Sequence, residues 1–269
     1  MIPALVLVLG SWTAEAGAET GGDCGGRFAK PGLPAHRGQF DAEDFTLLCR
    51  TKYAALHNNK TKISDWVIED LPRSQLSGAA DRKKSRFKED PDLKREDTPR
   101  ATLKDYRGSG FDRGHQAPAA DFKRSQTAMD ESFYLSNMAP QIGPGFNRGI
   151  WARLEERVRD LVRSRKRLIV ITGPVYESDA LPPPKKKEIG DSEPGVRVPE
   201  GFYKIVYDPK RRRALAFLMP NRKLRKRKIG EFRTTVRELE ELTGLNFFPA
   251  LSRRTQNILE ENVGEMWRW

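Results

Sequence analysis

The chain has 269 residues, which is long enough for one large domain or two small ones with a buried core. Lys and Arg number 49 against 37 Asp and Glu, and this net charge of +12 favours nucleic acid or an anionic membrane surface as a partner, unless the basic surface only maintains solubility. No run of about 18 apolar residues occurs, so we expect neither a bilayer-spanning segment nor stable membrane association.

The N-terminus has the pattern of a targeting segment. Residues 2–9 are apolar apart from Pro3, and small-x-small cleavage patterns end at Ala16 and Ala18, although no basic residue precedes them. We therefore expect a signal peptide over residues 1–18 and export to the periplasm or the medium. In a eukaryotic source, the mitochondrial intermembrane space is the other option. The alternative is an apolar tail without a targeting role.

Residues 19–44 are rich in Gly, Pro and charge, and we expect an extended arm there, followed by one folded domain over residues 45–269. The arm contains Cys24, and the first strand region contains Cys49, the second of the two cysteines. In an exported protein an even number of cysteines permits one disulfide, and the alternative is two unrelated thiols. Two Cys and three His do not readily form a structural zinc site without carboxylates.

Apolar runs separated by turn residues predict several strands, and two longer segments have a helical period. The expected strands are 53–57 paired with 63–69, then 168–172, and 202–207 paired with 214–219. The expected helices are 147–165 and 229–242, the second ending at Gly244. The segments 73–106 and 181–199 are expected to be loops. The basic run 222–228 is either a nucleic-acid contact or a solvated loop. Since no repeat or regular βαβ alternation occurs, the predicted class is α+β.

One histidine has an unusual setting. His115 ends the glycine-punctuated stretch Asp112-Arg113-Gly114-His115. An imidazole is suited to accept a proton near neutral pH, and a neighbouring Arg113 favours its neutral form and could also hold a phosphate. On this local context alone, a structural histidine remains the alternative.

The following helix adds two polar residues on an apolar face. At 100° per residue, the apolar positions from Trp151 onward lie within about 60° of Asn147, and Glu155 lies about 80° from it. An amide oxygen and a carboxylate that face inward from one helix could hold a hard, hydrated cation. The alternatives are that Asn147 is a helix N-cap and that Glu155 pairs with Arg159.

Several ordered blocks of the chain resemble the DNA/RNA non-specific endonuclease family, which includes secreted bacterial nucleases and mitochondrial endonuclease G. The signature block is Phe111-Asp-Arg-Gly-His-Gln-Ala-Pro-Ala-Ala120. Further blocks are Tyr134-Leu-Ser-Asn-Met-Ala-Pro-Gln141, Phe146-Asn-Arg-Gly-Ile-Trp-Ala-Arg-Leu-Glu155, Ile171-Thr-Gly-Pro174, Val198-Pro-Glu-Gly-Phe-Tyr-Lys204 and Leu242-Thr-Gly-Leu-Asn-Phe-Phe-Pro249. The resemblance covers roughly residues 45–251 and implies a ββα-metal fold (also called a His-Me finger) on a central antiparallel sheet with flanking helices.

The resemblance also implies a role for each candidate residue. His115 would be the general base that activates water, and Asn147 the direct ligand of Mg²⁺, with Mn²⁺ as a substitute. Glu155 would hold a metal-bound water, Asn137 would orient the site, and Arg113 would stabilise phosphate charge. A further family arginine lies upstream; the candidate is Arg86, although the spacing permits a shift of one position.

The function implied by this resemblance is sequence-non-specific, Mg²⁺-dependent hydrolysis of phosphodiester bonds in DNA and RNA to give 5′-phosphate ends. The expected partners are double- and single-stranded DNA and RNA, and the family suggests a homodimer. Two alternatives use the same scaffold. One is a catalytically inactive nucleic-acid-binding protein, against which the intact set of His115, Asn147 and Glu155 weighs, and the other is a phosphodiesterase acting on small phosphodiesters.

Overall fold

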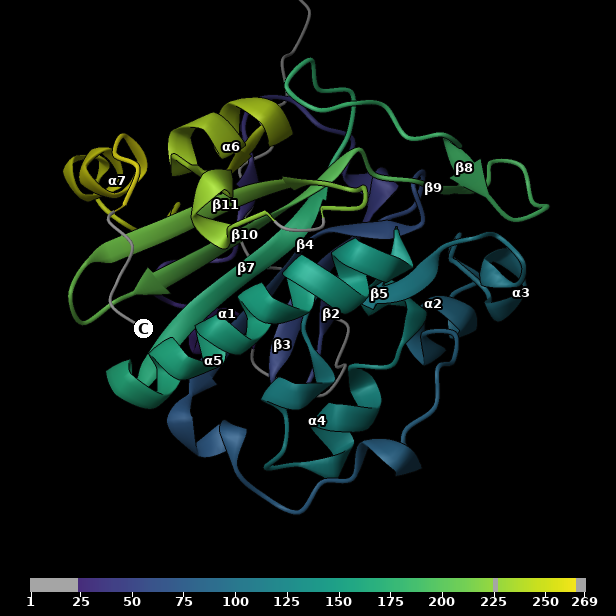
Figure 1. Ribbon diagram of the computed structural model, residues 1–269, viewed down its shortest axis with the longest axis horizontal. Coiled ribbons are helices and arrows are strands. Elements are labelled where there is room, and N and C mark those ends of the chain that lie inside the picture. Colours follow the sequence, from purple (N-terminus) through teal and green to yellow (C-terminus); the bar gives the residue numbers. More distant parts are fainter. Residues whose placement is uncertain (1–23, 225–226, 265–269) are drawn as a thin grey trace, which may run out of the picture.

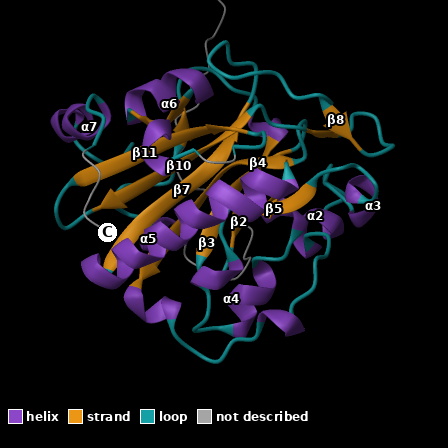
Figure 2. Cartoon of the chain, in the orientation of Figure 1, coloured by secondary structure: helices purple, strands orange, loops and turns teal. Residues whose placement is uncertain are grey.

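The computed structural model describes residues 24–224 and 227–264, so the expected signal peptide lies outside the described residues. A seven-stranded antiparallel sheet forms the centre of the fold (Figures 1 and 2). Its strands, in spatial order, are β12 (Arg233–Thr234), β11 (Arg213–Pro220), β10 (Gly201–Asp208), β7 (Arg167–Val175), β4 (Ile63–Pro72), β3 (Tyr53–Asn58) and β2 (Phe45–Cys49). Every expected strand is present, and the α+β class with a central antiparallel sheet is confirmed.

Both faces of the sheet are buried. Helix α5 (Ala152–Arg165) packs over one face, and Figure 1 shows it in front of β7. The short helix α4 (Gln126–Glu131) covers the β3 and β4 part of that face. Helices α6 (Val236–Thr243) and α7 (Arg253–Glu260) pack on the opposite face. Burial on both sides explains why β7 and β10 are nearly continuous apolar runs.

The described part of the N-terminal arm is attached to the domain at several points. It contains a helical turn, α1 (Cys24–Arg27), and a short strand, β1 (Ala35–His36), that pairs with β13 (Leu245–Asn246). A disulfide joins Cys24 to Cys49 in β2, so the two cysteines are not unrelated thiols. The arm is therefore only partly extended. Within residues 24–224 and 227–264, no helix has the length and apolar character needed to cross a bilayer.

The segment expected to be a loop over residues 73–106 has short helical turns. These are η2 (Arg73–Leu76), η3 (Arg82–Lys84), α2 (Pro91–Arg95) and α3 (Leu103–Tyr106). The turns η4 (Ala119–Asp121) and η5 (Leu135–Asn137) follow the motif region, and a small hairpin, β8 (Glu188–Ile189) and β9 (Val196–Arg197), lies within the second expected loop. Aspartate or serine N-caps begin several of the short helical elements, for example Asp90 at α2 and Ser125 at α4.

Both expected helices begin later than predicted. Regular helix over the segment 147–165 is limited to α5, because Arg148 and Gly149 have non-helical backbone angles inside the irregular turns η6 (Gly143–Trp151). Helix α6 begins at Val236, after the turn η7 (Ile229–Phe232) and strand β12, because Thr235 caps it by accepting a hydrogen bond from the Glu238 amide. Gly244, with φ of +70°, ends α6 as expected.

Candidate active site

A hairpin followed by a helix carries the motif residues. Strand β5 (Asp112–His115) pairs with β6 (Met138–Gln141), and the turns η6 then lead into α5. A Cβ atom on Gly114 would lie 2.2 Å from the Gln141 side chain, so only glycine fits at this close approach. This ββα arrangement places Asp112 within hydrogen-bond distance of Asn147, 35 residues later in the chain.

His115 lies among aromatic rings. The centre of its imidazole is 5.0 Å from the Phe133 ring, which it meets edge to face, and 5.7 Å from the Phe87 ring. Its Nε2 atom is buried and has no hydrogen-bond partner among the described residues. Burial, and then the positive charge of Arg82, lowers the pKa of His115 to about 3. The ring is therefore neutral near pH 7.

The Asn147 amide is oriented by a carboxylate. Its Nδ2 donates to Asp112 Oδ2 at 2.9 Å, and Arg148 Nε also contacts that oxygen at 3.0 Å. Because Nδ2 faces Asp112, the amide oxygen faces elsewhere, and no described residue donates a hydrogen bond to it. Asn147 lies in η6, outside the regular helix, so the helical-wheel reasoning for its position was wrong. The N-cap alternative is also wrong, because the residue before α5 is Trp151.

Glu155 lies in the first turn of α5 and forms no ion pair with the described residues. Arg159, its expected alternative partner, instead donates to Asp121 Oδ1 at 3.0 Å and to Glu156 Oε2 at 2.8 Å. Burial raises the pKa of Glu155 to about 7, and the charge of Lys204 opposes that rise. A carboxylate without a committed partner could accept a hydrogen bond from a metal-bound water.

A buried lysine lies beneath Glu155 on the α5 face of the sheet. Lys204 in β10 is 1% exposed, donates to Thr172 Oγ1 at 2.5 Å, and places its ammonium 4.9 Å from the centre of the Trp151 ring. Glu69 in β4 is equally buried, and its Oε2 has no hydrogen-bond partner among the described residues. Burial raises the pKa of Glu69 and lowers the pKa of Lys204, although the charges of Glu155 and Glu69 oppose the second change. Lys204 therefore balances negative charge beneath the site.

A pocket of about 580 Å³ is lined by Asn147, Asp112 and Arg113, and also by Phe87, whose ring lies 5.7 Å from that of His115. His115 and Glu155 are not among its lining residues. The Arg113 guanidinium stacks 4.3 Å from the centre of the Phe87 ring. Arg82 also lines the pocket, whereas the expected Arg86 does not and instead donates to the backbone oxygen of Ser85 at 2.9 Å. Arg82 begins the turn η3, and it is the residue of this basic segment that lines the pocket.

Asn137 is fully buried and acts on the backbone behind His115. Its Oδ1 accepts from the Ala117 amide at 2.9 Å, and its Nδ2 donates to the carbonyl oxygens of Ala117 and Ser132 at 2.9 and 2.8 Å. These three bonds fix the chain two residues after His115 to the turn before β6. This geometry agrees with an orienting role and not with direct contact to a substrate.

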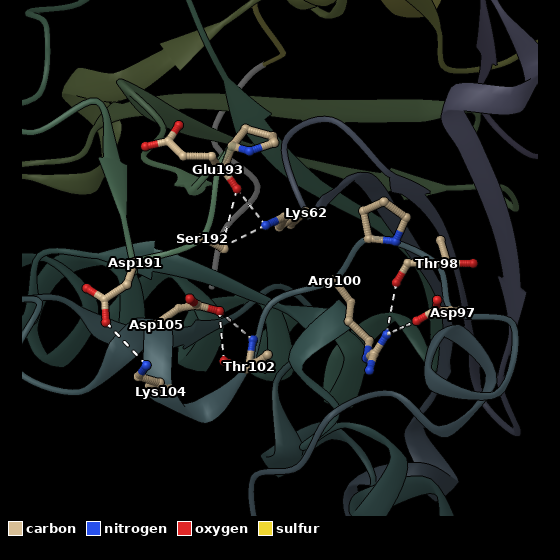
Figure 3. Close-up of a pocket in the computed structure, with 12 residues that line it drawn as sticks. Lys62, Asp97, Thr98, Arg100, Thr102, Lys104, Asp105, Asp191, Ser192 and Glu193 are labelled. Carbon is tan, nitrogen blue, oxygen red and sulfur yellow. Dashed lines mark hydrogen bonds and ion pairs between the residues drawn. The ribbon is translucent and has the colours of Figure 1, made fainter.

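A second pocket of about 550 Å³ does not have the chemistry of a catalytic site (Figure 3). Several of its charged residues contact one another or nearby polar groups: Lys62 donates to Ser192, Lys104 pairs with Asp191, and Asp105 accepts from Thr102, as the dashed lines in Figure 3 show. The described residues contain no group of three or more His, Cys, Asp or Glu that could hold a metal ion. A cation at the first pocket would therefore depend on the Asn147 oxygen and on water.

Sequence reasoning missed three residues at the site. Asp112 belongs to the quoted motif, and its carboxylate beside an arginine was a signal that could have been used. Lys204 appears as an interruption in the apolar run of β10, and a lysine in such a run is a sign of a buried charge. No signal in the sequence distinguishes Arg82 from the other basic residues around it.

Comparison with known proteins gives one consistent family. A family described as DNA/RNA non-specific endonuclease matches residues 34–254. The mitochondrial nuclease of Saccharomyces cerevisiae is 40% identical over 228 residues, which cover 80% of this chain and 69% of that protein. Human mitochondrial endonuclease G is 35% identical over 247 residues, which cover 89% of this chain and 79% of that protein.

Among solved structures, similarity extends over nearly the whole described fold. A chain in the crystal structure titled "Crystal structure of the EndoG/EndoGI complex: Mechanism of EndoG inhibition" superposes with a TM-score of 0.72 at 32% sequence identity. The superposition covers 86% of this chain and 93% of that chain. The fold and the sequence blocks therefore agree on one group of proteins.

Proposed function

The chain belongs to the DNA/RNA non-specific endonuclease family and is an endonuclease, and from this premise we propose a more specific activity. It hydrolyses phosphodiester bonds of DNA and RNA without sequence preference, requires Mg²⁺, and leaves 5′-phosphate and 3′-hydroxyl ends. The observation that carries the proposal is a pocket lined by Asn147, whose amide oxygen has no donor among the described residues, and by Arg82 and Phe87, the second of which lies 5.7 Å from the neutral imidazole of His115.

His115 is the proposed general base. Its imidazole takes a proton from water as the water oxygen bonds to phosphorus, and the bond from phosphorus to the 3′ oxygen breaks on the opposite side. Since burial lowers the pKa of His115 to about 3, the imidazole is in its proton-accepting form at neutral pH. Water rather than a ribose hydroxyl is the nucleophile, so the same residues serve both DNA and RNA.

The chemistry of Asn147 and Glu155 fits Mg²⁺. A hard cation that keeps several waters needs few protein ligands, and the Asn147 oxygen and the Glu155 carboxylate supply one direct ligand and one acceptor for a bound water. When bound, the cation would stabilise negative charge on the phosphate and on the leaving oxygen, and Mn²⁺ would substitute for it. Asp112 holds the Asn147 amide so that its oxygen remains available for this ligation.

Arginines around the pocket are the proposed phosphate contacts. Arg113 and Arg82 line it and stack on aromatic rings, Arg113 on Phe87 and Arg82 on Phe133 at 5.6 Å. Such stacking holds a guanidinium in place for a bidentate phosphate contact. Because phosphate neutralisation releases counterions, activity should fall as salt rises.

The biological setting is also part of the proposal. The Cys24–Cys49 disulfide is typical of an oxidising compartment, which agrees with an exported protein. The mitochondrial names of several relatives favour the intermembrane space as the other location. We retain the signal peptide over residues 1–18, the nuclease domain over residues 45–269 and a homodimer as proposals.

A plasmid-nicking assay tests the function. Wild-type protein should convert supercoiled DNA to nicked and then degraded forms with Mg²⁺, should also cut RNA, and should do neither with a chelator. Phosphatase treatment before 5′-end labelling of the products should be required, because the ends carry phosphate. His115→Ala should lose at least about 10²-fold in rate. Binding of DNA without cleavage in the presence of Mg²⁺ would favour the catalytically inactive nucleic-acid-binding protein. Turnover of a small diester without cleavage of DNA would favour the phosphodiesterase that acts on small phosphodiesters.

A further inference from the structure

One wall of the active-site pocket is apolar. Leu103, Tyr106 and Phe111 are among the lining residues, together with Arg82, Arg107, Arg113 and Arg148. Leu103 is 39% exposed and is one of four large exposed apolar residues in the described part of the chain. The pocket volume of about 580 Å³ lies in the range of small-ligand sites, about 300–1,000 Å³. The pocket therefore combines anion-binding groups with an exposed apolar contact.

The exposure of Leu103 does not come from a loosely held loop. Helix α3, which begins at Leu103, has a capping box in which Thr102 donates through its amide to Asp105 Oδ2 at 2.7 Å. Asp105 in turn packs against Gly190, where an added Cβ atom would lie 2.1 Å from its Oδ1 atom. These contacts fix α3 from two sides, so the structure holds Leu103 at the pocket wall.

A second observation at the same wall points to a ligand. Tyr106 is 5% exposed, and its hydroxyl is buried without a hydrogen-bond partner among the described residues. A buried hydroxyl without a partner costs free energy unless a bound group satisfies it. An apolar contact and an unused donor beside several arginines match a nucleotide, which has a flat base, a polar sugar and a phosphate.

We propose that Leu103 and Phe111 form a base-binding shelf, which holds the base of a nucleotide adjacent to the scissile phosphate while the arginines hold its phosphates. The proposal rests on the proposed endonuclease function and specifies its substrate. Because the shelf contacts the face of the base and not its pairing edge, it accepts all four bases.

The shelf has a consequence for the choice of substrate. Inside a duplex the face of a base is covered by its stacked neighbours, so the nucleotide must leave the stack to reach the shelf. Unstacking is least costly in single strands, gaps and frayed ends. We therefore expect a higher kcat/KM for single-stranded than for fully paired DNA of the same sequence.

An abasic-substrate experiment tests the shelf. The probe is a labelled single-stranded 15-nucleotide DNA with or without one central tetrahydrofuran abasic residue, cut by full-length protein with Mg²⁺ and mapped at each phosphate. Wild type should cut the phosphate on one side of the abasic residue about 5- to 100-fold more slowly than the same phosphate in intact DNA. An apolar base isostere at the same position should restore cleavage, because the shelf reads shape and not hydrogen bonds.

Two variants localise the effect. Leu103→Ser should slow cleavage of intact DNA and should no longer distinguish abasic from intact positions, with an unchanged melting temperature because Leu103 is on the surface. Ile258→Ser is the matched control, since Ile258 is 61% exposed on α7 and lines a different pocket. It should behave as wild type.

The outcomes separate the two proposals. Equal cleavage of abasic and intact positions by wild type would overturn the shelf and leave the endonuclease function standing. The same conclusion would follow if Leu103→Ser changed only the oligomeric state, because Leu103 would then be a contact between copies of the chain. Failure of wild type to cut either oligonucleotide would overturn the proposed function and the shelf together.

Discussion

The acid limb of the pH–rate profile should report Glu155 and not His115, the proposed general base. Burial lowers the pKa of His115 to about 3 and raises the pKa of Glu155 to about 7. Between about pH 5 and pH 8 the imidazole therefore stays neutral, whereas the carboxyl changes charge in the middle of this range. The carboxylate form, which could hold a metal-bound water, is the form present at higher pH, so activity should rise with pH.

The size of the effect follows from this pKa. With a pKa of about 7, about half of Glu155 is ionised at pH 7 and about a tenth at pH 6. Because kcat/KM reports ionisations of the free enzyme, it should fall about tenfold per pH unit below pH 6 and level off above pH 8. Raising Mg²⁺ should move the midpoint to lower pH, because a nearby cation favours the carboxylate.

The assay is initial-rate cleavage of a labelled oligonucleotide at low Mg²⁺, for wild type and Glu155→Gln. The variant should have a much lower rate and no acid limb near pH 7. Its thermal stability gives a second readout: a carboxyl whose folded pKa is raised loses stability as pH rises through that pKa, so Glu155→Gln should be more stable than wild type at pH 8. An unchanged acid limb in the variant would refute this reasoning.

Three further predictions concern residues around the site. Lys204→Met should lower the free energy of unfolding by about 3–5 kcal/mol, measured by urea unfolding, because it leaves buried carboxylates uncompensated. Adding Glu69→Gln should recover part of this loss. A loss under about 1 kcal/mol would contradict the role of Lys204 in balancing the buried carboxylates. Arg82→Ala should raise KM for DNA at least about tenfold, whereas KM of Arg86→Ala should stay within about twofold of wild type. The reverse order would contradict the proposal that Arg82 contacts the phosphate. Reducing the disulfide between the arm and β2 should cost about 2–4 kcal/mol of stability, measured by unfolding with and without reductant, and an unchanged midpoint would show that the bridge does not stabilise the fold.

Local patterns in the sequence predicted much of the fold. The paired strands β3–β4 and β10–β11 follow from apolar runs with turn residues between them, and the end of α6 follows from Gly244. Helix beginnings were predicted less well. The irregular turns at Arg148 and Gly149 break the helical period that placed Asn147 on the face of α5, although Asn147 does line the pocket.

The candidate site was predictable where its residues are close in sequence. Arg113 and His115 share one motif, and the resemblance to the endonuclease family named Asn147 and Glu155 as partners. Long-range pairing determines the rest. The position of Lys204 beneath Glu155 depends on the register of β10 against β7. Which basic residue of the segment around η3 lines the pocket depends on a short turn, and here it is Arg82.

We propose separate roles for His115 as base and Asn147 as metal ligand. Calorimetric titration of Mn²⁺ into wild type, His115→Ala and Asn147→Ala, followed by plasmid cleavage with each protein, tests these roles most directly. His115→Ala should bind Mn²⁺ as wild type does and yet fail to cut, whereas Asn147→Ala should lose both binding and cleavage. Normal cleavage by His115→Ala, or wild-type Mn²⁺ affinity in Asn147→Ala, would contradict the account.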